Sequence, residues 1–259
     1  MSLGRNQTAF DRLSIYEKVK ILEGENFVTV EDTKALSPAE LQSFIEHFIE
    51  DLAFDAIPNI NILINSKFPP EVDVVLSKNG FTLHDEVINV FKSLEGIILD
   101  NEPYFTFKSI GEITVQEFMD VWRAAMAESP NAPTSLTMDE QMRSVEKELG
   151  PGYRDSCIGA YENNNPIGVV MPHIEPGTFD EGRLFYFGLL PEERGKGKSK
   201  PLHRQALAVL QDYFEASYYI GSTSKKNTPM LRTFEASGCA ITEENKLYKK
   251  LLCLTKNYK

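Results

Sequence analysis

The chain has 259 residues, of which 42% are hydrophobic and 25% are charged, and its formal net charge is −11. This much apolar material forms one large or two small globular domains and excludes an intrinsically disordered protein. The acidic balance argues against a general affinity for nucleic acid or for a membrane surface, because both require a basic surface.

The cysteines and the apolar runs bear on the compartment. Cys157, Cys239 and Cys253 lie far apart with no paired spacing, which predicts buried free thiols and neither a disulfide framework nor a metal site. No apolar run approaches the roughly 20 residues of a membrane span, and the N-terminus shows no signal-peptide pattern. We therefore expect a cytoplasmic protein, and the sequence leaves a monomer and a homodimer both open.

Turn residues between two apolar runs divide the chain into two blocks, and the turn lies near Leu94 to Asn101. Helical and extended patterns alternate on both sides of this turn. We therefore expect a small α/β domain over residues 1–96 and a larger one over residues 97–259, with the whole chain in the α/β class and a mixed (α+β) sheet.

Local signals predict the elements of the first block. Ser37 is a suitable N-cap and Pro38 suits the first helical position, while Asn79-Gly80 provides a helix stop. The expected elements, in chain order, are a helix from Pro38, a strand at 60–65, a helix at 69–78 and an extended segment at 81–94.

The second block repeats this alternation over a longer stretch. Thr114 is expected to cap a helix with Glu117 as its capping-box partner, and Asn163 to Asn165 tolerate the left-handed backbone of a hairpin turn. The expected elements are a strand at 104–108, helices from Thr114 and at 139–149, strands at 156–162, 166–174 and 184–190, a helix at 200–216, a strand at 217–222, a helix at 228–237 and a strand at 247–252.

The segment between the strand at 184–190 and the following helix has the features of a phosphate-binding loop. Gly195 and Gly197 can adopt positive φ and bring main-chain N–H groups close to a ligand, and the helix N-terminus adds the positive end of its dipole. A nucleotide loop of the Walker type fits less well, because Glu192 stands where its first glycine is required. The pattern therefore predicts a bound phosphate group at a strand-to-helix turn.

The order of strand, Arg194-x-x-Gly197-x-Ser199, helix, strand and Asn227 resembles the GNAT superfamily of acyl-CoA N-acyltransferases over roughly residues 104–252. The family signature has glycine or alanine where this chain has Ser199. The resemblance implies a GNAT-like domain that uses acetyl-CoA or another acyl-CoA as co-substrate and needs no metal.

The resemblance also implies which residues surround the donor. Main-chain N–H groups of the loop would bind the pyrophosphate, and the strand before the loop would splay from its neighbour and pair with the pantetheine arm. Nearby lysines would add positive charge, and Asn227 would contact the pantetheine side, although asparagine before a helix is also a common cap. The implied cofactor-binding residues are Phe187, Leu189, Arg194, Gly195, Lys196, Gly197, Lys198, Ser199, Lys200 and Asn227.

A general acid for the leaving thiolate is not evident. Family members commonly have a tyrosine seven residues after the asparagine, and this chain has Phe234, whose ring cannot donate a proton. Three explanations stay open. In the first, positioning and backbone polarisation suffice for catalysis. In the second, Tyr186, Glu181 or His173 moves the proton, with Tyr186 and Glu181 as the candidate catalytic residues. In the third, the domain binds acyl-CoA without transferring the acyl group.

These observations predict an N-acyltransferase that moves an acetyl or similar group to a primary amine of a small molecule or peptide. The acidic net charge favours a cationic acceptor through electrostatic steering. The alternative is a non-catalytic acyl-CoA-binding or regulatory module.

One segment of the first block resembles part of the second. Residues 65–81 match residues 225–239 in the order of strand, proline-bearing loop, helix, glycine stop and strand. We hypothesise that residues 25–96 are a shortened, degenerate copy of the second half of the same fold, without a glycine loop and so without a cofactor site. The alternative is an unrelated small α/β cap, and a mismatch in strand order would exclude the duplication.

Overall fold

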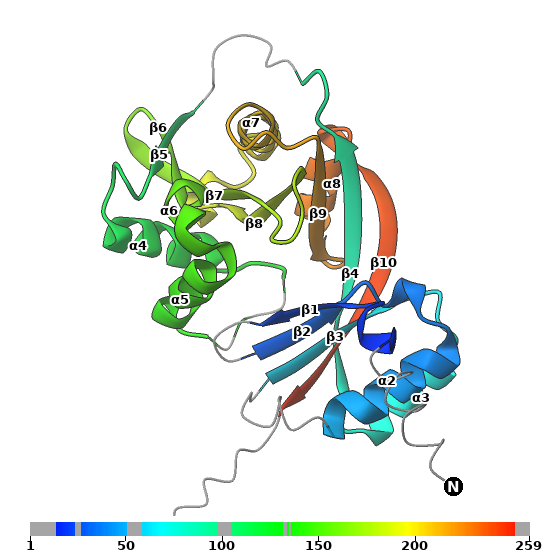
Figure 1. Ribbon diagram of the computed structural model, residues 1–259. Coiled ribbons are helices and arrows are strands. Elements are labelled where there is room, and N and C mark those ends of the chain that lie inside the picture. The colour runs from blue at the N-terminus through cyan, green and yellow to red at the C-terminus, as the bar shows by residue number, and fades with distance from the viewer. Residues whose placement is uncertain are drawn as a thin grey trace, which may run out of the picture. The chain divides into compact units, whose positions relative to one another are not determined.

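The computed structural model describes residues 14–23, 27–50, 59–97, 105–131, 134 and 136–251, and it divides into two compact units (Figure 1). Unit 1 comprises Met1–Val87 with Glu243–Lys259, and unit 2 comprises Ile88–Thr242. This division differs from the expected boundary between residues 96 and 97. The reason is that β4 (Thr82–Ser93) and β10 (Ala240–Leu251) are long strands that each contribute residues to both units.

Unit 1 has the strand order β1-β2-β3-β10-β4. Its other strands are β1 (Lys20–Glu23), β2 (Phe27–Glu31) and β3 (Asn59–Asn65). β1 and β2 are antiparallel, β2 and β3 are parallel, and β3 and β10 are antiparallel. The helix α2 (Pro38–Glu50) lies between β2 and β3 in the chain, and α3 (Glu71–Lys78) lies between β3 and β4.

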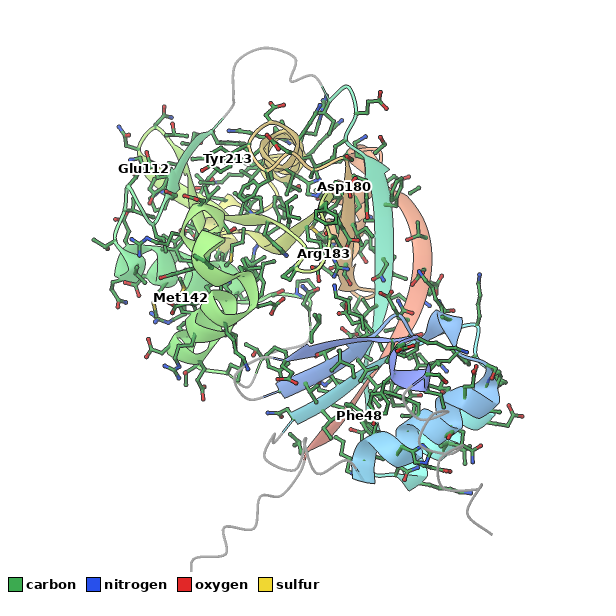
Figure 2. The ribbon with its side chains drawn as sticks, in the orientation of Figure 1. Phe48, Glu112, Met142, Asp180, Arg183 and Tyr213 are labelled. Carbon is green, nitrogen blue, oxygen red and sulfur yellow. The ribbon has the colours of Figure 1, made fainter. Side chains whose placement is uncertain are left out.

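The helices of unit 1 begin and end as the local signals predict. The Oγ of Ser37 accepts a hydrogen bond from the Glu40 N–H at 3.3 Å, and the Glu40 carboxylate accepts one from the Ser37 N–H at 2.8 Å. This reciprocal cap fixes the start of α2. Phe48 projects from α2 into the core with the strands of unit 1 (Figure 2), and Gly80 after α3 has φ 82°.

Unit 2 has the strand order β10-β4-β9-β8-β7-β6-β5. Consecutive pairs from β5 to β8 are antiparallel, whereas β8 and β9 are parallel. The strands are β5 (Thr106–Ser109), β6 (Ile158–Glu162), β7 (Asn165–Ile174), β8 (Glu181–Leu189) and β9 (Tyr218–Ser224). The helices are α4 (Val115–Met126), α5 (Met138–Leu149), α6 (Tyr153–Ser156), α7 (Ser199–Asp212) and α8 (Thr228–Ala236).

The two faces of the unit 2 sheet carry different helices (Figure 1). Val169 and Met171 of β7 pack in one apolar cluster with α4 and α5, while Val170 between them packs in another cluster with α7. Because successive side chains of a strand point to opposite faces, α4 and α7 cover opposite sides of the sheet. The crossover from β8 to β9 therefore runs through α7 on a single face.

The predicted mixed α/β fold is confirmed, and several local predictions hold in unit 2. The Oγ1 of Thr114 accepts a hydrogen bond from the Glu117 N–H at 3.1 Å, and Asn163 and Asn164 have φ of 51° and 64°. The strands β8 and β10 are longer than predicted, and neither β1 nor β2 was predicted. Cys157 is buried and Cys239 is partly buried, whereas Cys253 lies outside the described residues.

Candidate functional site

The parallel strands β8 and β9 are paired over only two positions. Glu181 is opposite Tyr218 and Gly182 is opposite Tyr219, and no further pair follows. β8 meanwhile continues to pair with β7 as far as Leu189. One edge of β8 therefore leaves its neighbour after Gly182, and the main-chain groups along this edge can pair with an extended ligand.

A bulge lies in the middle of β8. Its register with β7 changes between Val170, opposite Phe187, and Pro172, opposite Leu184, so that β8 contains one more residue than β7 over this interval. A bulge redirects the side chains around it. As a result, Phe185 and Tyr186, although adjacent in the chain, both pack against the apolar cluster of α4.

The loop between β8 and α7 has the conformation that its glycines predict. Gly195 and Gly197 have φ of 73° and 76°, in the left-handed region, and a Cβ built on either has no atom within 4 Å. In the described part of the chain, the main-chain N–H groups of residues 197–200 have no hydrogen-bond acceptor. Free N–H groups at a helix N-terminus form a site for an anion, and phosphate is such an anion.

A comparison with protein-family models supports the resemblance to the GNAT superfamily. Residues 117–239, which lie within unit 2, match the model of the acetyltransferase (GNAT) family. This segment belongs to the GNAT superfamily. No curated protein matches the chain in sequence.

Solved structures share the fold at low sequence identity. The chain is similar to a GCN5-related N-acetyltransferase from Sphaerobacter thermophilus, with 14% identity, a TM-score of 0.59, and 90% of this chain and 76% of that chain covered. It is also similar to a GCN5-related N-acetyltransferase from Kribbella flavida, with 11% identity, a TM-score of 0.53, and 96% of each chain covered. A third similar structure is a tandem GNAT protein from the clavulanic acid biosynthesis pathway, with 10% identity, a TM-score of 0.52, and 92% of this chain and 79% of that chain covered.

Within the GNAT domain, the side chain of Arg194 anchors the loop. Its Nη2 donates to the carbonyl oxygens of Ala125 at 2.9 Å and Ala127 at 2.8 Å, at the end of α4. Its Nε donates to the carbonyl oxygen of Leu189 at 3.2 Å, and its Nη1 donates to that of Glu128 at 3.3 Å. The guanidinium was expected among the cofactor-binding groups, but the structure directs it to main-chain carbonyls that hold the loop against α4.

The lysines of the loop are more neutralised than the sequence indicates. Lys198 lies 2.6 Å from Glu162 and 2.5 Å from Glu193, and Lys196 lies 3.2 Å from Glu193. Hydrogen bonds to these carboxylates raise the pKa of Lys198, and the bond from Lys198 lowers the pKa of Glu193. For Lys200 no ion pair is found among the described residues, so this lysine carries the unpaired positive charge nearest to the free N–H groups.

Asn227 acts as the cap of α8. Its Oδ1 accepts a hydrogen bond from the Met230 N–H at 3.2 Å, and its Nδ2 donates to Oδ1 of Asn131 at 2.9 Å. The same Asn131 oxygen accepts from Thr223 Oγ1 at 3.1 Å. Both ends of the Asn227 amide are thus engaged, which is the capping role that the sequence left open beside cofactor contact.

The remaining predicted cofactor residues line the divergence of the strands or the start of α7. Phe187 is half-buried on β8, with its ring edge-on to His203 of α7 at a centroid distance of 5.2 Å. Leu189 is buried at the end of β8, and the hydroxyl of Ser199 accepts a hydrogen bond from Thr233 at 3.2 Å. The structure therefore brings Phe187, Leu189 and residues 194–200 together along one path from β8 to α7.

The two candidate catalytic residues are held by the fold. The Tyr186 hydroxyl donates to the carbonyl oxygen of Ala125 at 2.8 Å, and burial raises the pKa of Tyr186 to about 12. The Glu181 carboxylate accepts from Arg183 Nε at 2.7 Å and from the Tyr218 hydroxyl at 3.2 Å, and Figure 2 labels Arg183 at this end of β8. Glu181 lies at the start of β8, in the short section that is paired with β9. About 26 Å of extended chain separates it from Leu189 at the other end of the strand.

Two other residues complete the comparison with the sequence. His173 is buried, with its Nε2 3.6 Å from the Glu175 carboxylate and its ring 6.3 Å from that of Phe185. Phe234, at the position of the expected acid, is 2% exposed and packs against His203 and Tyr219 with centroids at 5.5 Å and 6.3 Å. The ring of Phe234 is therefore part of the core of unit 2.

The described residues contain no group of three or more His, Cys, Asp or Glu side chains arranged to hold a metal ion. They also contain no helix with the length and apolar character needed to cross a bilayer.

Proposed function

We propose that unit 2 is an acyl-CoA-dependent N-acyltransferase that transfers an acetyl group from acetyl-CoA to a primary amine of a small molecule or peptide. The observation that carries the proposal is the divergence of β8 from β9 directly before a loop whose N–H groups at residues 197–200 have no acceptor among the described residues. This combination offers an open strand edge for an extended amide chain and an anion site at its end.

The residues of the chain have separate tasks in this proposal. Acyl-CoA supplies an activated thioester. The N–H groups of residues 195–200 bind the pyrophosphate, and the open edge of β8 near Phe187 and Leu189 orients the pantetheine arm. Arg194 fixes the loop through the carbonyls of α4, and Asn227 fixes the start of α8. These two side chains position the site without touching the cofactor.

Proton transfer is proposed to need no dedicated acid. The Tyr186 hydroxyl is already bound to a carbonyl, and the Glu181 carboxylate is shared between Arg183 and Tyr218. A thiolate is a good leaving group, so alignment of the amine with the thioester and main-chain N–H donors to its carbonyl oxygen supply the rate. Tyr186→Phe should accordingly keep most of the transferase activity.

The test measures release of free thiol from acetyl-CoA with a panel of primary amines that includes polyamines, aminoglycosides and lysine peptides. Turnover with an amine, and none without it, is the expected result. A rise in melting temperature with acetyl-CoA and none with ATP should accompany it, since a ligand of the native state stabilises that state. A response to ATP alone would contradict the donor assignment.

The buried ring of Phe234 favours a second candidate, a module that binds acyl-CoA without transferring its acyl group. The two candidates differ in a single readout. Tight CoA binding with no thiol release across the amine panel supports the module, and amine-dependent release supports the enzyme.

A further inference from the structure

His203 is a buried polar residue in an otherwise apolar place. It lies in the second turn of α7, is 0% exposed, and is surrounded by three aromatic rings. The centroid of its ring lies 5.2 Å from Phe187 of β8, 5.5 Å from Tyr219 of β9 and 5.5 Å from Phe234 of α8. The imidazole therefore contacts one side chain from each of the two strands that diverge.

Only one nitrogen of this imidazole has a partner. Nδ1 forms a hydrogen bond with the Ser237 hydroxyl at 2.9 Å, whereas Nε2 is fully buried without a partner in the described structure. Burial lowers the pKa of His203 to about 3, so the ring is neutral at physiological pH. Buried polar atoms in native proteins nearly always have partners, and an exception calls for an explanation.

We propose that Nε2 of His203 forms a hydrogen bond to an amide of the pantetheine arm of acyl-CoA, which makes His203 a cofactor-contacting residue. The inference rests on the proposed function of unit 2. His203 lies one helical turn after Ser199, at the start of α7, and against Phe187 on the open stretch of β8. An arm that runs from the pyrophosphate site along β8 passes this position.

Either form of the neutral ring suits such a partner. If the Ser237 hydroxyl donates to Nδ1, then Nε2 carries the proton and donates to an amide carbonyl. If Nδ1 donates to Ser237, then Nε2 accepts from an amide N–H. The pantetheine arm has two amides and so presents both kinds of group.

Access to Nε2 requires one side chain to turn aside. Tyr219 and Phe234 are both 2% exposed and fixed in the core, whereas Phe187 is half-buried. Phe187 is therefore the ring that moves when the arm binds. Phe187 lies directly after the bulge in β8, on the stretch of the strand that is paired with β7 but not with β9.

The test compares CoA with adenosine 3′,5′-bisphosphate, which lacks the pantetheine arm. Affinities for both are measured by calorimetry on the full chain and on His203→Leu, His203→Asn and His203→Gln. The Gln amide reaches the place of Nε2, whereas the Asn amide reaches only that of Nδ1, so these two variants form a matched pair. We expect His203→Leu and His203→Asn to bind CoA about tenfold more weakly, with His203→Gln within about threefold, and no change for the bisphosphate.

Unchanged CoA affinity in a folded His203→Leu, or equal weakening for both ligands, would overturn the inference and leave the proposed function standing. Failure of the unaltered chain to bind CoA would instead remove the proposed function. If the variants do not fold, imidazole nitrogen shifts of the ¹⁵N-histidine-labelled chain decide the matter. The chain has only four histidines. A shift of the His203 Nε2 signal with CoA and none with the bisphosphate supports the contact, and no shift with either ligand overturns it.

Discussion

The segment β1-β2-α2-β3-α3-β4 and the segment β7-β8-α7-β9-α8-β10 have the same order of elements, and their first three strands have the same relative directions. In each, the first two strands are antiparallel, the second and third are parallel, and a short 3₁₀ turn precedes the crossover helix. The turns are Thr33–Ala35 and Pro191–Glu193. A mismatch in strand order would have excluded a duplication, and the strand orders of these two segments match. The duplication stays a prediction.

The two segments differ where the second has its proposed cofactor site. β2 and β3 remain paired over four positions, from Phe27 opposite Asn59 to Val30 opposite Ile62, whereas β8 and β9 are paired over two. The turn after β2 has no glycine, and its Thr33 hydroxyl donates to the carbonyl oxygen of Leu63 at 2.8 Å. The comparison teaches that the order of elements alone makes no site. Strands that diverge and a loop with two glycines distinguish the segment with the proposed site from the other.

The largest effect is expected for Gly197→Glu. A side chain at φ 76° inserts bulk and a negative charge beside the free N–H groups, so CoA affinity should fall at least about 100-fold. Gly177→Glu is the matched control, because Gly177 has φ 85° and likewise no atom within 4 Å of a built Cβ. Calorimetry and thermal melting check both variants. Unchanged CoA affinity in folded Gly197→Glu would contradict the placement of the pyrophosphate.

Arg194→Ala should destabilise unit 2 by about 2–3 kcal/mol, because four carbonyl oxygens lose a charged donor. Urea unfolding measures this change. Arg123→Ala, which removes only an exposed pair with Asp120, should change stability by less than about 0.5 kcal/mol. Equal effects of the two substitutions would show that the loop is not anchored through Arg194.

Glu193→Gln should strengthen CoA binding about threefold at low salt, because it removes the carboxylate that pairs with Lys196 and leaves Lys198 paired with Glu162 alone. The gain should disappear in 0.5 M salt, at which charges in water are screened over a few ångströms (about 4 Å). Glu146→Gln on the exposed face of α5 is the control. Titrations at two salt concentrations measure the effect, and a salt-independent gain would point to a change in loop shape instead.

The smallest effect concerns unit 1. Asp32 has φ 56°, so Asp32→Gly should raise the free energy of unfolding by about 0.5 kcal/mol, and Asp32→Ala should lower it by about 1 kcal/mol. Neither variant should change CoA affinity or the number of bound CoA molecules, because β2 and β3 stay paired. A second bound CoA in Asp32→Gly would show that a glycine alone creates the site.

The sequence predicted what is encoded locally. Ser37 and Thr114 cap their helices, Gly80 and Gly238 follow α3 and α8 with positive φ, and Gly197 has the left-handed backbone that the motif required. Each of these depends on residues within one or two helical turns.

The features that the sequence did not predict depend on distant residues. Lys198 is neutralised by Glu162, which is 36 positions earlier in the chain, and the acceptors of Arg194 lie at the end of α4. The start of β10 has two apolar residues followed by the polar Thr242 to Glu244 and offers no alternating pattern, so this part of the strand is fixed by its neighbours in the sheet. His203 occupies an apolar helical position, and its polar side chain was the one available signal.

The pairing of β10 with β3 has a consequence for biosynthesis. Residues 245–251 lie opposite residues 59–65, so the sheet of unit 1 is completed by a strand that follows the whole of unit 2 in the chain. Unit 1 therefore cannot finish folding until unit 2 has been synthesised, even though most of unit 1 is translated before it. For expression of unit 1 by itself, β10 must be joined to the N-terminal segment through a new linker, because a cut after residue 96 exposes the edge of β3.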